Sequence, residues 1–113
     1  MSGRLVLAAC LLLGVEGSAL AAHAAVAAAP KPDQIEIHNF MFMPKTLTVP
    51  VGARVTWINR DEEPHTVVSA GGQFAPSKAL DSNDRYVTTF SKPGTYVYYC
   101  TVHPFMTGTV IVK

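Results

Sequence analysis

With 113 residues, the chain has room for one small domain with a single hydrophobic core. Its nine Lys and Arg residues nearly balance its eight Asp and Glu residues, so the formal net charge is only +1 at neutral pH. A charge this small gives no sign of a nucleic-acid-binding surface or of a polybasic membrane patch. We therefore expect a monomer whose partners do not include nucleic acid.

Residues 1–24 have the layout of a secretory signal peptide. A short basic start is followed by an apolar run over residues 5–15 and then by Ala-x-Ala triplets. A membrane anchor is disfavoured, because this run is shorter than the roughly 20 residues that span a bilayer and Glu16 interrupts it. We expect cleavage after Ala21 or Ala24, and hence a periplasmic protein without a membrane attachment.

Two cysteines occur, one in the expected signal peptide and one near the C-terminus. The residues before Cys10 resemble a bacterial lipoprotein box, but the apolar stretch there is shorter than the roughly 7 to 15 residues usual in signal peptides. Removal of the signal peptide leaves Cys100 as a single thiol in an oxidising compartment, where it cannot form an internal disulfide. Metal ligation would explain such a thiol.

After a Pro-containing linker over residues 25–33, the remaining residues, 34–113, have the pattern of a β domain. An apolar bend is expected at residues 40–44 and a long connection at residues 71–84. Helix caps followed by helically spaced apolar residues are not evident. About seven to eight short strands indicate an all-β fold, an antiparallel Greek-key β-sandwich. We expect strands at residues 34–38, 45–49, 54–59, 65–69, 85–90, 95–100 and 108–112.

The stretch from Cys100 to Met106 offers a thiolate, an imidazole and a thioether at three-residue spacing. These are three of the four side chains of a mononuclear electron-transfer copper site, in which a trigonal His, His, Cys set has a long axial Met bond. Cys100 closes an expected strand and Met106 nearly opens the next one. One hairpin loop can therefore bring Cys100, His103 and Met106 to a point.

A second histidine must come from elsewhere in the chain. His23 leaves with the signal peptide, and His38 lies on the polar side of an amphipathic strand, where a solvated surface histidine is expected. His65 remains, at the start of a strand that follows a polar loop. Pro64 restricts the backbone that leads into it.

These features resemble the cupredoxins, and within them the amicyanins. The likeness covers residues 34–113 and rests on the Cys-x-x-His-x-x-Met loop combined with the upstream Pro64 and His65, and on the segments 55–60 and 94–96. It implies a cupredoxin-like fold and one type 1 copper ion that cycles between Cu(I) and Cu(II). The ligands that it implies are His65, Cys100, His103 and Met106.

The resemblance also implies a function and an electron-transfer surface. The protein would be a periplasmic one-electron carrier that docks transiently with redox proteins, methylamine dehydrogenase as donor and a c-type cytochrome as acceptor. His65 would be internal, whereas His103 would show its ring edge at the surface beside Pro104 and Phe105.

Four residues next to the ligands are candidates for shaping the site: Pro64, Thr66, Thr101 and Val102. Val102 stands where the resemblance leads us to expect proline, and Thr66 stands where it suggests asparagine. The amide N–H that valine has and proline lacks would favour Cu(I) if it were aimed at the sulfur. The hypothesis that follows is a raised reduction potential.

Other interpretations use some of the same residues. A periplasmic copper carrier or store would trade metal rather than electrons through the same ligands. An enzyme is disfavoured because four filled ligand positions leave none for substrate, and zinc is disfavoured because it rarely takes methionine. Met41 and Met43 could collect Cu(I), although packing at the core and rim is favoured. Asp61 and its two acidic neighbours are expected in a solvated loop, although next to His65 they could also tune the field of the site or steer a basic partner.

Overall fold

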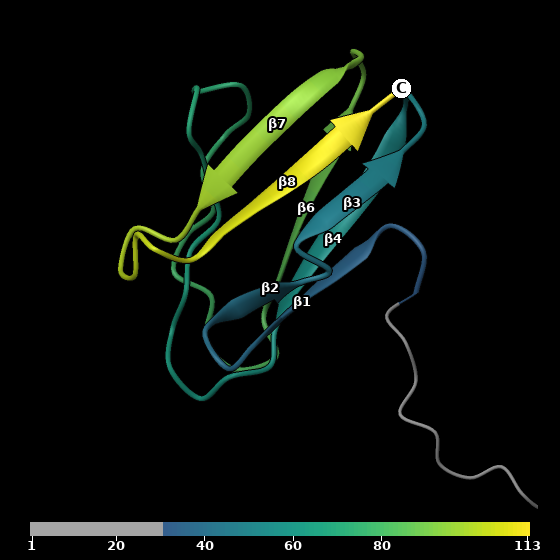
Figure 1. Cartoon of the computed structure of the whole chain (residues 1–113). Helices are drawn as coiled ribbons and strands as arrows, with labels where there is room; N and C mark the ends of the chain where they lie inside the picture. Colours follow the sequence, from purple (N-terminus) through teal and green to yellow (C-terminus); the bar gives the residue numbers. More distant parts are fainter. Residues whose placement is uncertain (1–30) are drawn as a thin grey trace, which may run out of the picture.

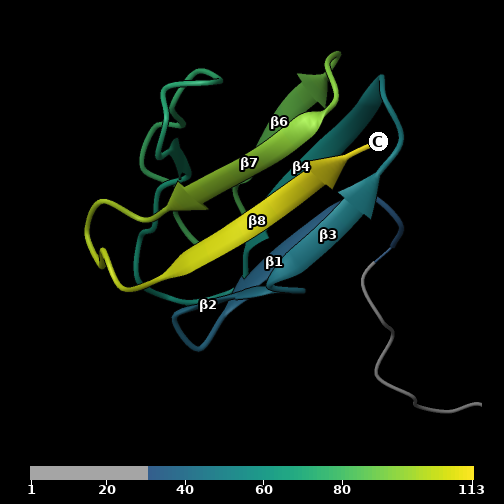
Figure 2. The same ribbon diagram turned by 45° about the horizontal axis from the view of Figure 1, so that its top comes forward.

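The computed structural model describes residues 31–113, which form two four-stranded β-sheets packed face to face (Figure 1). The same two layers are visible after rotation (Figure 2). This arrangement confirms the all-β sandwich that the sequence predicts. The expected signal peptide and nearly all of the expected linker lie outside the described residues. Within the described range, no helix is long and apolar enough to cross a membrane.

Each sheet mixes strands from the two halves of the domain. The first sheet has the order β2-β1-β4-β6 and the second has the order β3-β8-β7-β5. The strands of the first sheet are β2 (Met41–Met43), β1 (Gln34–His38), β4 (Ala53–Asn59) and β6 (Arg85–Phe90). Those of the second are β3 (Thr46–Val49), β8 (Thr107–Val112), β7 (Gly94–Tyr99) and β5 (Val68–Ser69).

The sheets are mixed rather than wholly antiparallel as expected. Strand β1 runs parallel to β4, with Ile35 opposite Trp57, and β3 runs parallel to β8, with Leu47 opposite Val110. The remaining pairs are antiparallel. Alternation of apolar and polar residues determines which face of a strand is buried, but it does not determine the direction of the neighbouring strand.

Strand β2 replaces the bend expected over residues 40–44. Asn39 and Phe40 have φ angles of 54° and 58°, both in the left-handed region. Two such residues form the type I′ turn that suits the twist of a tight hairpin. The chain therefore folds back at once, so that Met41 lies opposite His38 in the antiparallel register.

The expected strand over residues 65–69 is also shorter than predicted. His65 makes an isolated antiparallel bridge with Leu80, and regular pairing starts only at Val68. Pro64 lacks an N–H group and keeps the backbone before His65 out of a regular ladder. The result is a compact connection that places His65 inside the molecule.

The core confirms the expected inward faces of the strands. Ile35 and Ile37 of β1 and Val55 and Trp57 of β4 are buried between the sheets. The Trp57 ring meets the edge of the Tyr98 ring, with the centroids 5.3 Å apart. These rings fix the spacing of the two sheets under the end that carries the candidate ligands.

Gly108 allows β7 and β8 to pair closely. The Tyr98 ring lies over this residue, and a Cβ atom added there would be 2.3 Å from the Tyr98 hydroxyl oxygen. Real atoms do not approach so closely, so any larger residue would displace the ring. The frame below the β7–β8 loop therefore depends on glycine at this position.

Candidate metal centre

The loop between β7 and β8 is held closed by its own backbone. The Cys100 N–H donates to the carbonyl oxygen of Met106 at 3.1 Å, and the Met106 N–H donates to the carbonyl oxygen of His103 at 2.8 Å. The His103 N–H donates in turn to the carbonyl oxygen of Cys100 at 3.2 Å. These bonds continue the β7–β8 pairing into a tight turn, so three of the predicted ligands lie at one end of the sandwich.

His65 reaches the same end from the other side of the fold. Its N–H donates to the carbonyl oxygen of Leu80 at 3.1 Å, and its carbonyl oxygen accepts from the Leu80 N–H at 2.7 Å. The side chain has no exposed surface. Pro64, the residue before it, is exposed and stiffens this entry. In both ribbon views the β7–β8 loop projects beside the connection that carries His65 (Figures 1 and 2).

The three nitrogen and sulfur donors converge. The ligand atoms of His65, Cys100 and His103 all lie within 4.8 Å of one another. The Cys100 Sγ is 3.7 Å from Nδ1 of His65 and 3.9 Å from Nδ1 of His103. A trigonal ion with bonds of about 2.0 to 2.3 Å to such ligands separates them by about 3.7 Å. The spacing therefore fits a metal ion bound by three donors.

The chemistry of the donors fits copper. Thiolate and thioether sulfur are soft ligands, and imidazole suits copper in both oxidation states. Met106, the last residue before β8, is buried, and its backbone is hydrogen-bonded to Cys100 and His103 in the same closed loop. A carboxylate, which would suit a harder ion, is not among the three convergent donors. Among the described residues, this set has the composition of a type 1 copper site.

The sulfur of Cys100 accepts hydrogen bonds from both the backbone and the side chain of Thr66. The Thr66 N–H lies 3.4 Å from Sγ, and its hydroxyl oxygen lies 3.8 Å from Sγ. That hydroxyl oxygen also lies 2.8 Å from the Thr101 hydroxyl oxygen and accepts from the Thr101 N–H at 2.9 Å. Thr66 and Thr101 thus join the two segments that supply the ligands.

Val102 lies outside this network. Its side chain is 57 % exposed, and the backbone amides that act on the sulfur belong to Thr66 and His103. The expectation that the Val102 N–H is aimed at Sγ is therefore not met in this structure. Its side chain contributes apolar surface instead.

The thiol of Cys100 is prepared for metal binding. Burial on its own raises the pKa of the thiol, but the Thr66 amide and the rings of His103 and His65 more than offset it, and the pKa falls to about 6. The thiolate, the form that binds metal, is then the main form at neutral pH. Less proton release is needed when the ion binds.

Asp61 does not lie in a solvated loop, and it contacts one of the predicted ligands. Its carboxylate is almost wholly buried. It accepts hydrogen bonds from the Asn39 and Phe40 amides at 2.7 and 2.9 Å, and its Oδ2 lies 2.8 Å from Nε2 of His65. This contact fixes the His65 ring with Nδ1 toward the sulfur, an arrangement typical of metal-binding histidines.

The same contacts determine the pKa of Asp61. Burial raises the pKa of the carboxyl group, but the amides of Phe40 and Asn39, and then the His65 ring, lower it below its ordinary value. The carboxylate is therefore ionised when it faces His65. The signal in the sequence was the spacing of an acidic residue four positions before a candidate ligand.

Aromatic rings cover the metal centre. The edge of Phe40 lies against both imidazoles, with its centroid 5.2 Å from that of His65 and 4.9 Å from that of His103. Phe105 flanks His103 at 6.1 Å and is 77 % exposed. His65 is thus enclosed, whereas His103 is only half-buried at an apolar surface.

Comparison with known proteins identifies the family. The family model for the cupredoxin-like domain matches residues 5–112. The chain belongs to the cupredoxin family. This cupredoxin is 35 % identical to amicyanin-alpha of Methylorubrum extorquens, over 96 % of the chain and 98 % of that protein. It is 38 % identical to amicyanin of Paracoccus denitrificans over 70 % of the chain, and spans 63 % of the length of that relative.

Solved structures show the same family relationship. A purple cupredoxin from Nitrosopumilus maritimus superimposes with a TM-score of 0.66 at 36 % identity, over 71 % of this chain and 98 % of that chain. Plastocyanins are also among the relatives. One structural neighbour is a copper-containing nitrite reductase, and the match covers 25 % of that chain. Together with the donor set, these relatives identify a type 1 copper protein that transfers electrons.

Of the core and rim positions expected for Met41 and Met43, the structure shows the rim only. Phe42, between them, is buried in the core, but both methionines of β2 are exposed. Alternation along the strand turns Phe42 inward and its two neighbours outward. These thioethers therefore do not fill the core.

Proposed function

We propose that this cupredoxin is a periplasmic one-electron carrier whose copper ligands are His65, Cys100, His103 and the axial Met106. The convergence of three donor atoms within 4.8 Å, from two segments of the fold, is the observation that carries the proposal. Copper bound there supplies one-electron chemistry by alternating between Cu(I) and Cu(II). The four side chains fill the coordination positions, which supports electron transfer rather than catalysis on a bound substrate.

The residues around the ligands keep the donor atoms in place. Asp61 holds the His65 ring, and the Thr66 hydroxyl group holds Thr101, the residue after Cys100. Neither bond uses the lone pair with which His65 Nδ1 or Cys100 Sγ would bind the ion, so both bonds are compatible with either oxidation state of a bound copper. A site held in this way needs little rearrangement when it gains or loses an electron.

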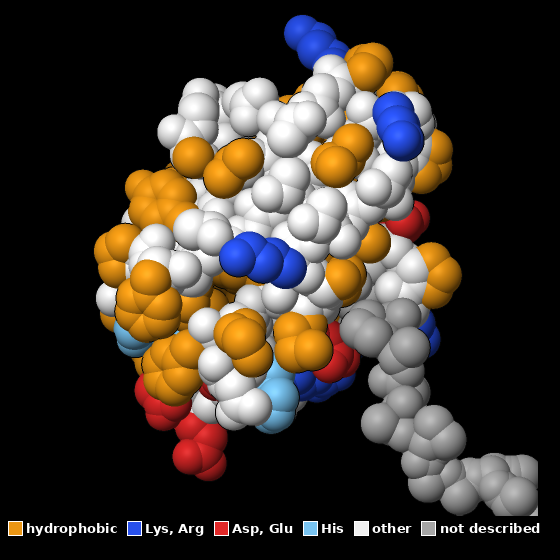
Figure 3. Space-filling view, in the orientation of Figure 1, with side chains coloured by type: hydrophobic (Ala, Val, Ile, Leu, Met, Phe, Trp, Pro, Cys, Tyr) orange, Lys and Arg blue, Asp and Glu red, His pale blue; other side chains and the backbone are white. Residues whose placement is uncertain are grey.

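His103 serves in this proposal as the point of electron exchange. Its half-buried ring lies at a surface formed by Val102, Pro104 and Phe105, all exposed. Figure 3 shows hydrophobic side chains gathered beside a histidine at the edge of the molecule. An apolar surface with few charges suits a brief encounter between redox proteins.

The similarity to amicyanins supports particular partners. We infer that a methylamine dehydrogenase donates the electron and that a c-type cytochrome accepts it. Export to the periplasm through residues 1–24 would bring the carrier to these proteins. Mass spectrometry of the exported protein tests this part: the mature chain should begin after Ala21 or Ala24.

Repeated redox cycling tests the function. The copper-loaded protein should cycle between its oxidised and reduced forms with one copper retained per chain, even in the presence of a modest copper chelator. Stopped-flow mixing with a reduced methylamine dehydrogenase should then bleach the oxidised protein. A chain that gives up its copper to the chelator or to an apo-protein within a few cycles would instead be a copper carrier.

A further inference from the structure

The hairpin of β1 and β2 places an imidazole and two thioethers on one surface. His38 is directly opposite Met41, and Glu36 is directly opposite Met43. Directly opposite residues of an antiparallel pair point to the same face, with Cβ atoms about 4.5 to 5.5 Å apart. Met41 and Met43 are two positions apart on one strand, so they also share that face. Ile37 and Phe42 occupy the opposite, buried face.

All three side chains are accessible. The exposed fraction is 57 % for His38, 52 % for Met41 and 46 % for Met43. In Figure 3, a histidine borders hydrophobic side chains over the region of the β1–β2 hairpin. Methionine has three rotatable bonds and a polarisable sulfur, so two thioethers about 7 Å apart at their Cα atoms can converge on one ion.

The orientation of His38 supports a role as a ligand. Its Nδ1 is 3.9 Å from Oδ1 of Asp61, the buried carboxylate that also holds His65. At this distance the two groups are not hydrogen-bonded, so the carboxylate does not fix the tautomer of His38. Either ring nitrogen of the neutral imidazole can carry the lone pair that binds a metal ion, and Nε2 is the one farther from Asp61.

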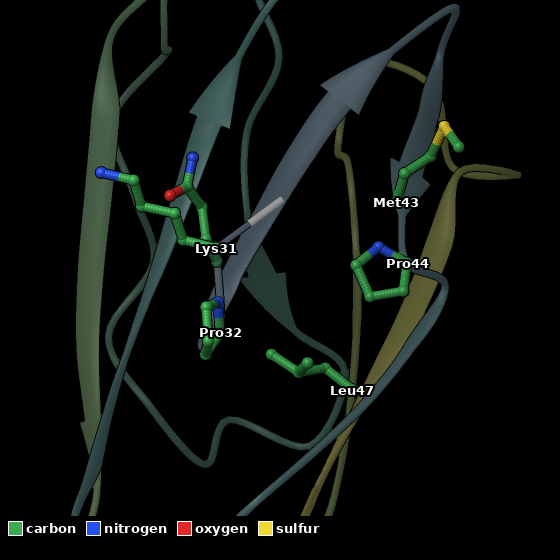
Figure 4. Close-up of a pocket in the computed structure, with 6 residues that line it drawn as sticks. Lys31, Pro32, Met43, Pro44 and Leu47 are labelled. Carbon is green, nitrogen blue, oxygen red and sulfur yellow. The ribbon is translucent and has the colours of Figure 1, made fainter. Parts of the chain in front are cut away.

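The surroundings of Met43 leave its sulfur free to move. Met43 lines a shallow hollow of about 310 Å³ together with Lys31, Pro32, Gln34, Pro44 and Leu47. Figure 4 shows the Met43 sulfur turned away from Pro44 and on the far side of the hollow from Lys31. Glu36, opposite Met43, forms an ion pair with Arg60, with Oε2 3.6 Å from Nε, so these two charges offset each other beside the thioether.

We propose that His38, Met41 and Met43 form a second metal site on the outer face of the β1–β2 hairpin, which binds one soft monovalent cation, Cu(I). Two thioethers and one imidazole select Cu(I) over hard divalent cations. This site goes beyond electron transfer and does not depend on it. It lies on the hairpin whose turn carries Phe40, the ring that covers both histidines of the first site.

A titration with Cu(I) tests the proposal. Reduced protein with one copper already bound is mixed anaerobically with further Cu(I) in the presence of a weak colorimetric Cu(I) chelator. We expect a second equivalent to bind. The ¹³C-methyl NMR signals of Met41 and Met43 should shift with it, while that of Met106 stays unchanged.

Variants separate the proposed ligands from the surrounding surface. M41L/M43L nearly conserves volume and should weaken binding of the second equivalent at least tenfold, while the first copper is retained. His38→Gln should weaken it as well, and this single change decides the matter if the double variant does not fold. Val87→Leu, on exposed β6 of the same sheet, is the matched control and should bind two equivalents.

Two results would overturn the proposal. One is a wild-type protein that binds a single equivalent, as expected if this face only contacts a protein partner. The other is unchanged binding of the second equivalent by M41L/M43L or by His38→Gln. Neither result affects the redox cycling of the first copper, so failure of this site and failure of the electron carrier are distinguishable.

Discussion

The two histidines of the candidate metal centre have opposite surroundings. His65 is fully buried, paired with Leu80 through its backbone and held by Asp61 at its Nε2 atom. His103 lies in a short exposed loop and has aromatic edges, Phe40 and Phe105, as its ring neighbours. The half of the site around His65 is thus enclosed and held by the Asp61 carboxylate. The half around His103 is exposed at the surface.

This difference shows how a small protein combines a rigid site with access for a partner. The buried half fixes the geometry through a carboxylate that also binds the β1–β2 turn, so the hairpin and the ligand are held together. The geometry of the exposed half is held only by the closed β7–β8 loop and by the two strands that flank it. Loss of Asp61 should therefore damage the fold and the site together, whereas changes near His103 should act mainly on exchange with partners.

Removal of Asp61 has the largest expected effect. Asp61→Ala leaves the Asn39 and Phe40 amides and the buried His65 N–H without their acceptor. A buried donor left unpaired, such as that of His65, costs about 1 to 3 kcal/mol, and the two partly exposed amides cost less. We therefore expect a loss of about 3 kcal/mol in the free energy of unfolding. Urea denaturation of the metal-free protein measures it.

Glu62→Ala is the matched control for this change. Glu62 is the next residue and is exposed, so its removal should change stability by less than about 0.5 kcal/mol. If Asp61→Ala and Glu62→Ala lowered the free energy of unfolding equally, Asp61 would not stabilise the enclosed half.

Substitution of Gly108 tests the frame below the exposed half. Gly108→Ala forces the Tyr98 ring away from the strand, and overpacking of this kind costs about 1 to 3 kcal/mol. Thermal unfolding should show a lowered midpoint. Gly71→Ala, whose added methyl group meets only Gln73 at 3.5 Å, should have little effect. Equal unfolding midpoints for Gly108→Ala and Gly71→Ala would contradict the close packing of the Tyr98 ring over Gly108.

Titration of Cys100 tests the link between the two halves. Burial raises the pKa of this thiol, but hydrogen bonds from Thr66 and His65 of the enclosed half and from His103 of the exposed half together lower it to about 6. The unfolded chain has the ordinary value of about 8.5. The thiolate therefore adds stability that is fully present above pH 8.5 and is lost as the pH falls through 6. Ultraviolet absorbance of the metal-free protein should show a midpoint near pH 6. A midpoint above pH 8 would contradict the hydrogen-bonding scheme.

Much of the fold follows from local patterns. Alternation in residues 34–38 and 54–59 predicts both strands and their buried faces, because the period of two is a property of the backbone. The ligand spacing from Cys100 to Met106 is equally local. The turn at Asn39 could have been found, since Asn commonly adopts the left-handed conformation in hairpin turns.

Features that depend on distant contacts were not accessible from the sequence. The burial of Asp61 arises from amides about 20 residues earlier in the chain. The parallel pairing of β1 with β4 likewise depends on how two segments meet, and neither strand encodes the direction of its neighbour. The donor on the Cys100 sulfur, Thr66, lies 34 residues away, whereas sequence proximity pointed to Val102.

The visible absorption spectrum of the copper-loaded protein tests the assignment of the metal centre most directly. We predict an intense blue band from charge transfer between the Cys100 thiolate and Cu(II). The band should be absent from Cys100→Ser, and adding copper or an oxidant to that variant should not restore it. A colourless Cu(II) form of the wild-type protein, or a blue band that survives in Cys100→Ser, would contradict the assignment.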